Sequence, residues 1–340
     1  MSTSVRRRAL PVLALTAGAA LLLSACSGDP GDAPADLETR TIASEVGDST
    51  VPVDPEMIVA LDEPAALNML SIGITPDVVF DSWRTTVPKA ILESAGIEMA
   101  TTSSFYPELE EVAAFEPDLI VGTAAEGFAE SGPAYASIAP LIGALYAEAD
   151  GSQIIEAYGE YFDRPAEAAR VSDALDALAE ETAATQPAGE TSISVLMSWA
   201  QDNMPLYMDA ANSLHGTIAA AGFTRPPLQD EVPAEGSAFG GWTVFSPEQL
   251  PAQDADVLAI AVAAQYNLEG ITEMPLYPSL AAVTNDRSLV VDGDLWSGGA
   301  AFYTYWVLRD LATIAAGDDA PGTVDDGAER WNDYLTAIGG

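Results

Sequence analysis

The chain has 340 residues, a length that favours two domains over one, and 49% of them are hydrophobic, which is enough to build sizeable cores. It carries 52 acidic against 12 basic residues, for a net charge of −40, and a surface this acidic repels nucleic acid and anionic lipid headgroups. The single cysteine excludes an intramolecular disulfide, and the single histidine excludes a metal site built from several histidines.

The N-terminal segment has the pattern of a secretory signal. Three arginines at 6–8 precede an apolar run over 9–23, which is too short to span a bilayer comfortably. The sequence Leu-Ser-Ala-Cys that ends at Cys26 resembles a bacterial lipobox. That resemblance implies a signal peptide over residues 1–25, cleavage before Cys26 and a lipid anchor on its sulfur. An ordinary secretory signal with an incidental cysteine is the alternative.

Residues 26–52 are rich in Gly, Asp, Pro, Ser and Thr, which predicts a flexible tether. At random-coil scaling this length reaches roughly 25–30 Å, enough to hold a domain clear of a membrane. Removal of residues 1–25 would take away three arginines and no acid, so the net charge of the mature chain would become −43. We interpret the acidity as an adaptation for solubility, and whether salt drives it stays open.

Short apolar runs alternate with helical patterns in the next segment, residues 53–163. Alternation of this kind predicts a parallel sheet covered by helices, and thus a first α/β lobe. The apolar runs predict strands, and the intervening segments predict helices that end at Gly73 and Gly96. The strands are expected over 57–61, 78–80, 97–99 and 119–121, and the helices over 63–70, 88–95 and 107–115.

A long helix is predicted over 165–185, in a linking segment that we place at 164–187. This stretch contains no glycine and only its initial proline, and Val171, Leu175 and Leu178 form one apolar stripe. A second α/β pattern follows and defines a C-terminal lobe over 188–340. We therefore predict the α/β class, with two lobes joined by a single long rigid helix and a ligand cleft between the lobes. In the second lobe, strands are expected over 193–199, 206–208, 257–262 and 289–291, and helices over 213–221, 247–250, 302–315 and 328–338.

Six segments, in the right order, resemble the periplasmic binding proteins for ferric siderophores and vitamin B12. Each segment is weakly specific alone, and together they extend from about Pro55 to Ala316. They are Pro55–Leu61 with Leu67–Pro76, Glu110–Ile120, Tyr135–Pro140, Ser246–Leu250, Asp254–Leu258 and Trp296–Gly299. The sequence departs from the family at Ala65 and Ala66, where an acidic or polar residue is frequent.

The resemblance implies the substrate-binding lipoprotein of an ABC importer, which captures a ferric siderophore and delivers it to a membrane permease. It implies a monomer that is not an enzyme, has no cofactor and does not bind metal directly, because the siderophore already fills the coordination sphere of the iron. The anchored protein would lie on the extracytoplasmic face of the cell membrane. A haem, cobalamin or other metal chelate is the alternative ligand. A surface hydrolase or an adhesion lipoprotein is a weaker alternative, since no Gly-x-Ser-x-Gly motif and no repeat is present.

Ligands bind at the carboxyl ends of the strands in open α/β sheets, so loops that follow strands hold the candidate site residues. Arg84 follows the second strand, and its guanidinium is suited to chelating oxygens. Aromatic residues in such loops predict the apolar walls of the site. The candidates are Trp83, Tyr106, Trp199, Phe239, Trp242, Tyr266 and Trp296. For each of them, packing in the core is an equally good interpretation.

The resemblance also implies one exposed glutamate per lobe that meets basic residues of the permease. The matching residues are Glu110, eight before Asp118, and Glu248, eight before Asp256. The equal offset predicts equivalent helices in two similar lobes. Glu111 is the rival of Glu110, and the number of membranes around the cell stays open.

Overall fold

The computed structural model describes residues 38–83, 85–124, 128–145, 149–186, 191–238 and 240–339. The predicted signal sequence, Cys26 and the first part of the predicted tether therefore lie outside the described residues. So do Arg84 and Phe239. Within the described part of the chain, no helix is both long and apolar enough to cross a membrane.

The first lobe is built on a five-stranded sheet in the order β5-β4-β3-β6-β7, in which every pairing is parallel. Strand β3 is apolar and buried, and β6 is buried except at its last residue, because helices cover both faces of a parallel sheet. The strands are β3 (Ile58–Ala60), β4 (Val78–Asp81), β5 (Glu98–Thr101), β6 (Leu119–Ala124) and β7 (Leu141–Leu145). The helices are α1 (Glu63–Ser71), α2 (Thr86–Ser94), α3 (Leu109–Ala113), α4 (Phe128–Tyr135) and α5 (Gly151–Tyr161).

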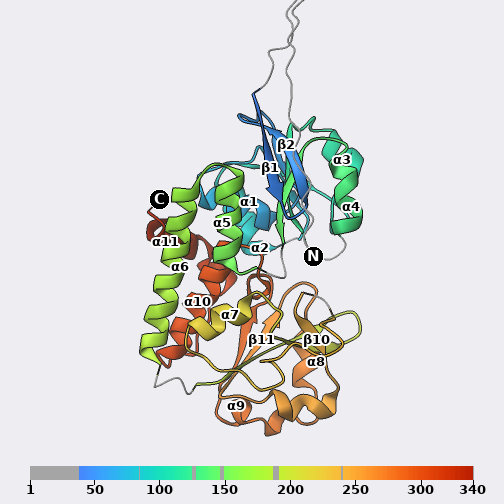
Figure 1. The fold of residues 1–340 in the computed structure, drawn as a ribbon. Coiled ribbons are helices and arrows are strands. Elements are labelled where there is room, and N and C mark those ends of the chain that lie inside the picture. Colours follow the sequence, from blue (N-terminus) through green and yellow to red (C-terminus); the bar gives the residue numbers. More distant parts are fainter. Residues whose placement is uncertain are drawn as a thin grey trace, which may run out of the picture. The chain divides into compact units, whose positions relative to one another are not determined.

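The second lobe, which holds β10 and β11 in Figure 1, has its own sheet. This sheet has five strands in the order β10-β9-β8-β11-β12. Here β8, β11 and β12 are parallel, whereas β9 and β10 run antiparallel to their neighbours. The strands are β8 (Ile193–Trp199), β9 (Met204–Met208), β10 (Trp242–Val244), β11 (Val257–Val262) and β12 (Ser288–Asp292). The short helices are α7 (Leu214–Ala220), η1 (Pro247–Gln253), α8 (Glu269–Thr272), η2 (Tyr277–Ser279), α9 (Ala281–Thr284) and η3 (Leu295–Ser297).

Helix α6 (Pro165–Thr185) links the lobes with the bounds that the sequence predicts. Its first residue is a proline, whose fixed φ suits the first helical position. The buried face includes Ala168, Val171 and Leu175, and the helix packs against α5, α7 and α10. The prediction of two α/β lobes joined by one long helix is confirmed.

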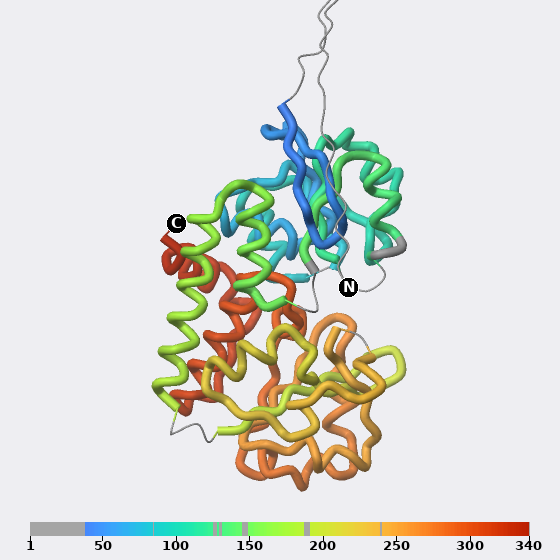
Figure 2. The backbone as a smooth tube through the Cα atoms, in the orientation of Figure 1, coloured from blue at the N-terminus to red at the C-terminus, as the bar shows by residue number. Residues whose placement is uncertain are grey.

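The C-terminal helices return to the first lobe, although the sequence assigns them to the second. Helix α10 (Ala301–Ala315) packs on α1, α5 and α6 as well as on η3 and α7 of the second lobe, and α11 (Gly327–Ala337) packs on α2. The tube in Figure 2 shows the C-terminal segment beside the segment that holds α5 and α6. The short η4 (Val324–Asp326) lies between α10 and α11. Asn68 of α1 donates to the Gly299 carbonyl at 3.1 Å and accepts from the Ala301 amide at 3.0 Å.

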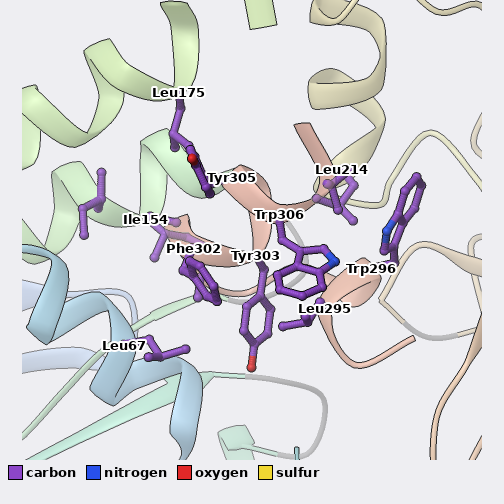
Figure 3. Close-up of a cluster of buried hydrophobic side chains, with 14 of the residues drawn as sticks. Leu67, Ile154, Leu175, Leu214, Leu295, Trp296, Phe302, Tyr303, Tyr305 and Trp306 are labelled. Carbon is purple, nitrogen blue, oxygen red and sulfur yellow. The ribbon is translucent and has the colours of Figure 1, made fainter. Parts of the chain in front are cut away.

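An aromatic cluster on α10 fills the space between helices of both lobes. Figure 3 shows Phe302, Tyr303 and Trp306 on this helix, with Leu67 of α1 and Leu214 of α7 around them. All five side chains are buried. Because large aromatic side chains bury the most apolar area, this cluster ties the first lobe, α6 and the second lobe into one core.

The predicted tether is wrong for residues 39–52, which form a β-hairpin. Strands β1 (Thr39–Ser44) and β2 (Gly47–Pro52) pair antiparallel over six residue pairs. Ile42 and Val51 are buried, and the Ser49 hydroxyl donates to the Leu141 carbonyl at 2.5 Å. The polar composition indicated a tether, but two apolar residues on one face of the hairpin are enough to anchor it to the first lobe.

Candidate ligand-binding faces

The first lobe presents a stack of aromatic rings at the carboxyl ends of β4 and β5. The ring of Trp83 lies 5.5 Å from that of Phe105 with an interplanar angle of 21°, a stacked arrangement. Phe105 is 49% exposed, which is unusual for so large an apolar side chain. Tyr106 contacts Phe105 edge to face at 5.0 Å and in turn contacts Phe128 of α4. The exposed Phe105 ring, backed by the packed rings of Trp83 and Tyr106, forms a flat apolar surface that we call the aromatic platform.

Two buried acidic residues lie directly behind this platform, at the carboxyl end of β3. Asp62 caps α1 by accepting from the Ala65 amide at 2.8 Å, and it also accepts from the Thr123 amide at 2.7 Å. Glu63 accepts from the amides of Trp83 at 3.0 Å and Thr85 at 3.2 Å. Burial raises the pKa of Glu63 to about 7, and the nearby charge of Asp62 adds to the shift. Burial also raises the pKa of Asp62, although its hydrogen bonds oppose the effect.

The second lobe places a smaller aromatic pair at the carboxyl ends of β8 and β11. The rings of Trp199 and Tyr266 lie 5.4 Å apart, and the two residues also form an isolated antiparallel bridge. Asp292 and Asp294 follow at the end of β12, where Asp292 accepts from the Asp294 amide at 3.0 Å. Burial, together with the charge of Asp292, raises the pKa of Asp294 to about 7. The face of the second lobe is therefore aromatic and acidic.

Two predicted site residues are core residues, and the prediction is wrong for them. Trp242 lies in β10, is 4% exposed and packs in the core. Trp296 is fully buried, and its indole N–H donates to Asp310 at 2.8 Å. A tryptophan fits the core as well as a binding site when its indole N–H has a buried hydrogen-bond acceptor. The sequence does not reveal whether such an acceptor is present. Arg84 and Phe239 lie outside the described residues.

The predicted docking glutamates occupy equivalent positions in the two lobes. Glu110 in α3 and Glu248 in η1 are exposed. In each lobe, the side chain of the next residue accepts a hydrogen bond from the backbone N–H at the start of the same helix. In the first lobe that residue is Glu111, which accepts from the Glu108 amide at 2.8 Å and from the Thr102 hydroxyl at 2.9 Å. In the second it is Gln249, which accepts from the Ser246 amide at 2.9 Å. Glu111 is thus engaged in capping its helix.

Most of the described basic side chains are engaged with other groups of the protein. Five form ion pairs with carboxylates within 4 Å, and Arg225 is buried, where it donates to the Met208 carbonyl at 2.9 Å. The ion-paired residues are Lys89, Arg170, Arg287, Arg309 and Arg330. No cluster of three or more His, Cys, Asp or Glu side chains in the described ranges could hold a metal ion.

Sequence reasoning singled out the aromatic residues of the faces but missed Glu63. The sequence did contain a sign of it, because Asp62 and Glu63 directly follow an apolar strand. Acidic residues at such a position are covered by the loop that follows. One acid of such a pair is expected to cap the helix. The sequence did not show that the other acid would accept the amides of the loop after β4.

Comparison with known proteins shows the same architecture. No family model matches the chain. It is 26% identical over 327 residues to the Bacillus subtilis protein named "Probable siderophore-binding lipoprotein YfiY", a match that covers 87% of this chain and 94% of that protein. It is 27% identical over 297 residues to the "Fe(3+)-citrate-binding protein YfmC" of Bacillus subtilis, covering 82% and 88% of the two chains.

Among solved structures, the FhuD protein from S. pseudintermedius superposes with a TM-score of 0.66 at 20% sequence identity, covering 84% of this chain and 100% of that chain. The fold is that of the two-lobed periplasmic siderophore-binding proteins. The predicted resemblance to the siderophore-binding proteins of ABC importers is therefore confirmed, both along the sequence and in the fold.

Proposed function

We propose that this protein is the extracytoplasmic substrate-binding lipoprotein of an ABC importer, which captures a ferric siderophore and delivers it to the membrane permease. The observation that carries the proposal is the two-lobed fold, matched over almost the full length of a FhuD structure, with aromatic residues at the carboxyl ends of the strands in both lobes. A siderophore is bulky and partly apolar, and it already coordinates its iron. Exposed rings are what such a ligand requires from the protein.

The ligand would lie between the two aromatic faces, with Trp83 and Tyr106 from the first lobe and Trp199 and Tyr266 from the second. Arg84 belongs to the same proposal as a donor to the chelating oxygens, on the sequence argument alone. Phe239 stays in the proposal on the sequence argument alone, and Trp242 and Trp296 are left out because they are buried in the core.

The charge of the protein favours a neutral or cationic ferric hydroxamate as ligand. A tricatecholate complex carries about three negative charges and requires several basic groups to offset them. Five of the described basic side chains are already paired with carboxylates, and the face of the second lobe carries Asp292 and Asp294. The relative named for Fe(3+)-citrate supplies a second candidate ligand, ferric citrate, which is anionic.

Membrane attachment and docking complete the proposal. Cys26 would carry the lipid anchor, 12 residues before the first described residue, Glu38. The permease would contact the exposed Glu110 and Glu248, one on each lobe. Glu110 is preferred to Glu111 because the carboxylate of Glu111 is engaged in capping. The mature protein would act as a monomer on the extracytoplasmic face of the cell membrane.

Tryptophan fluorescence tests the ligand class directly, because Trp83 and Trp199 lie on the proposed faces. The purified chain from residue 38 onward would be titrated with iron(III) desferrioxamine B, iron(III) enterobactin, ferric citrate, haemin and cobalamin. We expect quenching with a micromolar or lower dissociation constant for the trihydroxamate. Tight binding of the tricatecholate without the trihydroxamate would refute the hydroxamate preference. Binding of none of the iron complexes would refute the proposed function.

A further inference from the structure

Glu63 is a buried acid that accepts hydrogen bonds from the segment that follows β4. Its side chain belongs to the first turn of α1 and is fully buried. One carboxylate oxygen accepts from the Trp83 amide at 3.0 Å, and the other accepts from the amide and the hydroxyl of Thr85 at 3.2 and 3.3 Å. All three donors follow β4, so Glu63 ties α1 to the loop that carries the aromatic platform.

The adjacent acid shows that this arrangement is specific to Glu63. Asp62 is equally buried, but its oxygens accept from Ala65 on its own helix and from Thr123 at the end of β6. Asp62 therefore stabilises the start of the helix and its junction with the sheet. Of the two acids, only Glu63 holds the loop after β4.

The position of Trp83 depends on this contact. Its backbone N–H is fixed by the carboxylate, while its ring stacks on the half-exposed Phe105. We propose that Glu63 is a positioning residue for ligand binding: its ionised carboxylate fixes Trp83 and Thr85, and thereby holds the Trp83 ring over Phe105 in the arrangement that receives the ligand. This inference rests on the proposed function, since it assumes that the platform binds a ligand.

Protonation of Glu63 should loosen the segment, because amide donors bond more strongly to a carboxylate than to a neutral carboxyl group. Burial raises the pKa of this group to about 7. Among the described residues, the titratable groups around the two acids are the Asp81–Lys89 pair on β4 and α2 and Tyr158 on α5, and the two acids also interact with each other. Thr123 of β6 is neutral, and α10 is joined to α1 through the neutral Asn68.

Ligand affinity and stability should then respond to pH in opposite directions. Affinity should fall as the pH drops through about 7, because the platform loses its fixed geometry. The folded pKa of Glu63 lies above its ordinary value, so the contribution of this group to stability is greatest at low pH and is lost as the pH rises toward 7. A residue with only a structural role would change both properties in the same direction.

The test compares Glu63→Gln with Glu167→Gln, which removes an acid from the first turn of α6 instead. Iron(III) desferrioxamine B is the probe, since its iron coordination is unchanged between pH 6 and 8. For the wild type we expect binding to weaken roughly fivefold from pH 8 to pH 6. Glu63→Gln should bind roughly tenfold more weakly at pH 8 and show little pH dependence, whereas Glu167→Gln should match the wild type. Wild-type affinity in Glu63→Gln, or a retained pH dependence, would overturn the inference.

A ligand-free measurement separates this inference from the proposed function. The fluorescence of Trp83, taken as the difference between the wild type and Trp83→Phe, should change with a midpoint near pH 7. The transition should vanish in Glu63→Gln and move to lower pH in Asp62→Asn, because the charge of Asp62 raises the pKa of Glu63. If the wild type binds no iron complex but shows this transition, the proposed function fails while the coupling of Glu63 to Trp83 stands. If the transition is absent or survives in Glu63→Gln, the inference fails.

Discussion

The two lobes share one half of their architecture, the central parallel strand pair and the helix that precedes its second strand, and we call this the shared half. They differ in the strands on the other side of that pair, which we call the divergent half. In each lobe the central strand pair is parallel, β3 with β6 and β8 with β11, and an aspartate directly before the second strand binds the start of the first. Asp118 accepts from the Glu56 and Met57 amides at 2.7 and 3.0 Å, and Asp256 accepts from the Ser192 amide at 2.8 Å. A short capped helix with an exposed glutamate precedes each aspartate.

The lobes diverge on the other side of the central pair. The first continues with β4 and β5, both parallel, and buries Asp62 and Glu63 at the ligand face. The second continues with β9 and β10, both antiparallel, and buries Arg225 and Gln229 behind the sheet. The shared half contains the proposed docking residues. The divergent half contains the aromatic platform of the first lobe, whereas Trp199 and Tyr266 of the second lobe follow the shared pair β8 and β11. The proposed function would use the shared half to dock on two similar permease subunits and the differing aromatic faces to bind an asymmetric ligand.

The largest expected effect comes from the buried polar network of the second lobe. Gln229 accepts from the Val195 amide at 3.1 Å and from Arg225 at 2.5 Å, and it donates to Ser194 and Gln253. Gln229→Leu would leave the amide and the guanidinium without this acceptor. At about 1–3 kcal/mol for each unsatisfied group, unfolding free energy should fall by about 4 kcal/mol.

Urea unfolding measures this loss, and Gln201→Leu serves as the control because Gln201 is exposed in a turn of the same lobe. The control should change stability by less than about 0.5 kcal/mol. If Gln229→Leu lowers the unfolding free energy by less than about 1 kcal/mol, the buried network contributes little to stability. The difference between the buried polar groups of the two lobes would then not be a difference in stability.

The second prediction concerns the interior of the first lobe. Because the pKa of Glu63 rises from 4.5 to about 7 on folding, ionisation of this group should cost about 3 kcal/mol of stability as the pH increases over that range. Glu63→Gln should remove this component, so the difference in unfolding free energy between mutant and wild type should grow in favour of the mutant from pH 4.5 to 7. Parallel pH profiles for the two proteins would contradict the assignment.

A third prediction tests the shared half directly. Asp118→Ala and Asp256→Ala remove the same kind of contact, a carboxylate that accepts from backbone amides at the start of a neighbouring strand. Each replacement should cost about 1.5 kcal/mol in unfolding free energy. Losses that agree within about 0.5 kcal/mol would support equivalence of the lobes. If only one replacement destabilises the protein, the two aspartates are not equivalent in stability, although each lies eight residues after its docking glutamate.

Sequence periodicity predicted most of the strands and the linking helix well, because apolar runs and glycine stops report on local structure, but it did not predict β7, β10, α4 or α5. Pro165 and the apolar stripe through Val171 and Leu175 gave the bounds of α6. The hairpin over 39–52 was missed because only Ile42, Val51 and Pro52 are buried in it, too few for a pattern. The return of α10 and α11 to the first lobe was missed because it depends on contacts between residues far apart in the chain, such as the 2.8 Å contact between Tyr334 and Ser71.

The candidate site was predictable only in part, for the same reason. Sequence position placed Trp83 and Tyr106 in loops after strands, and the structure places them beside the exposed Phe105. Trp296 lies in a similar sequence context, but the buried carboxylate of Asp310 makes it a core residue. An aromatic residue in a loop thus becomes part of the site or of the core according to its partners, which only the fold brings together.

The smallest change in unfolding free energy is expected at the predicted docking glutamates. Replacing them tests whether the two lobes are also equivalent in function. Glu110 and Glu248 are exposed, and neither carboxylate forms an ion pair within the described residues. The double replacement Glu110→Ala and Glu248→Ala should change unfolding free energy by less than about 0.5 kcal/mol and leave siderophore affinity unaltered. Reduced siderophore affinity would instead place these residues at the ligand face.

Transport should respond far more strongly than stability. Exposed charges at an interface mainly govern association rate and salt dependence, so the double mutant should dock more slowly and its uptake should lose sensitivity to ionic strength. Each single mutant should lose a similar share of the uptake rate if the lobes meet equivalent permease subunits. The exposed pair Glu180→Ala and Glu181→Ala on α6 provides a control of equal charge change, with uptake expected to remain normal. The measurement is siderophore uptake with reconstituted permease. If the control loses as much uptake as the docking mutant, the effect comes from net charge alone. If the docking mutant takes up siderophore normally, neither glutamate belongs to the docking surface.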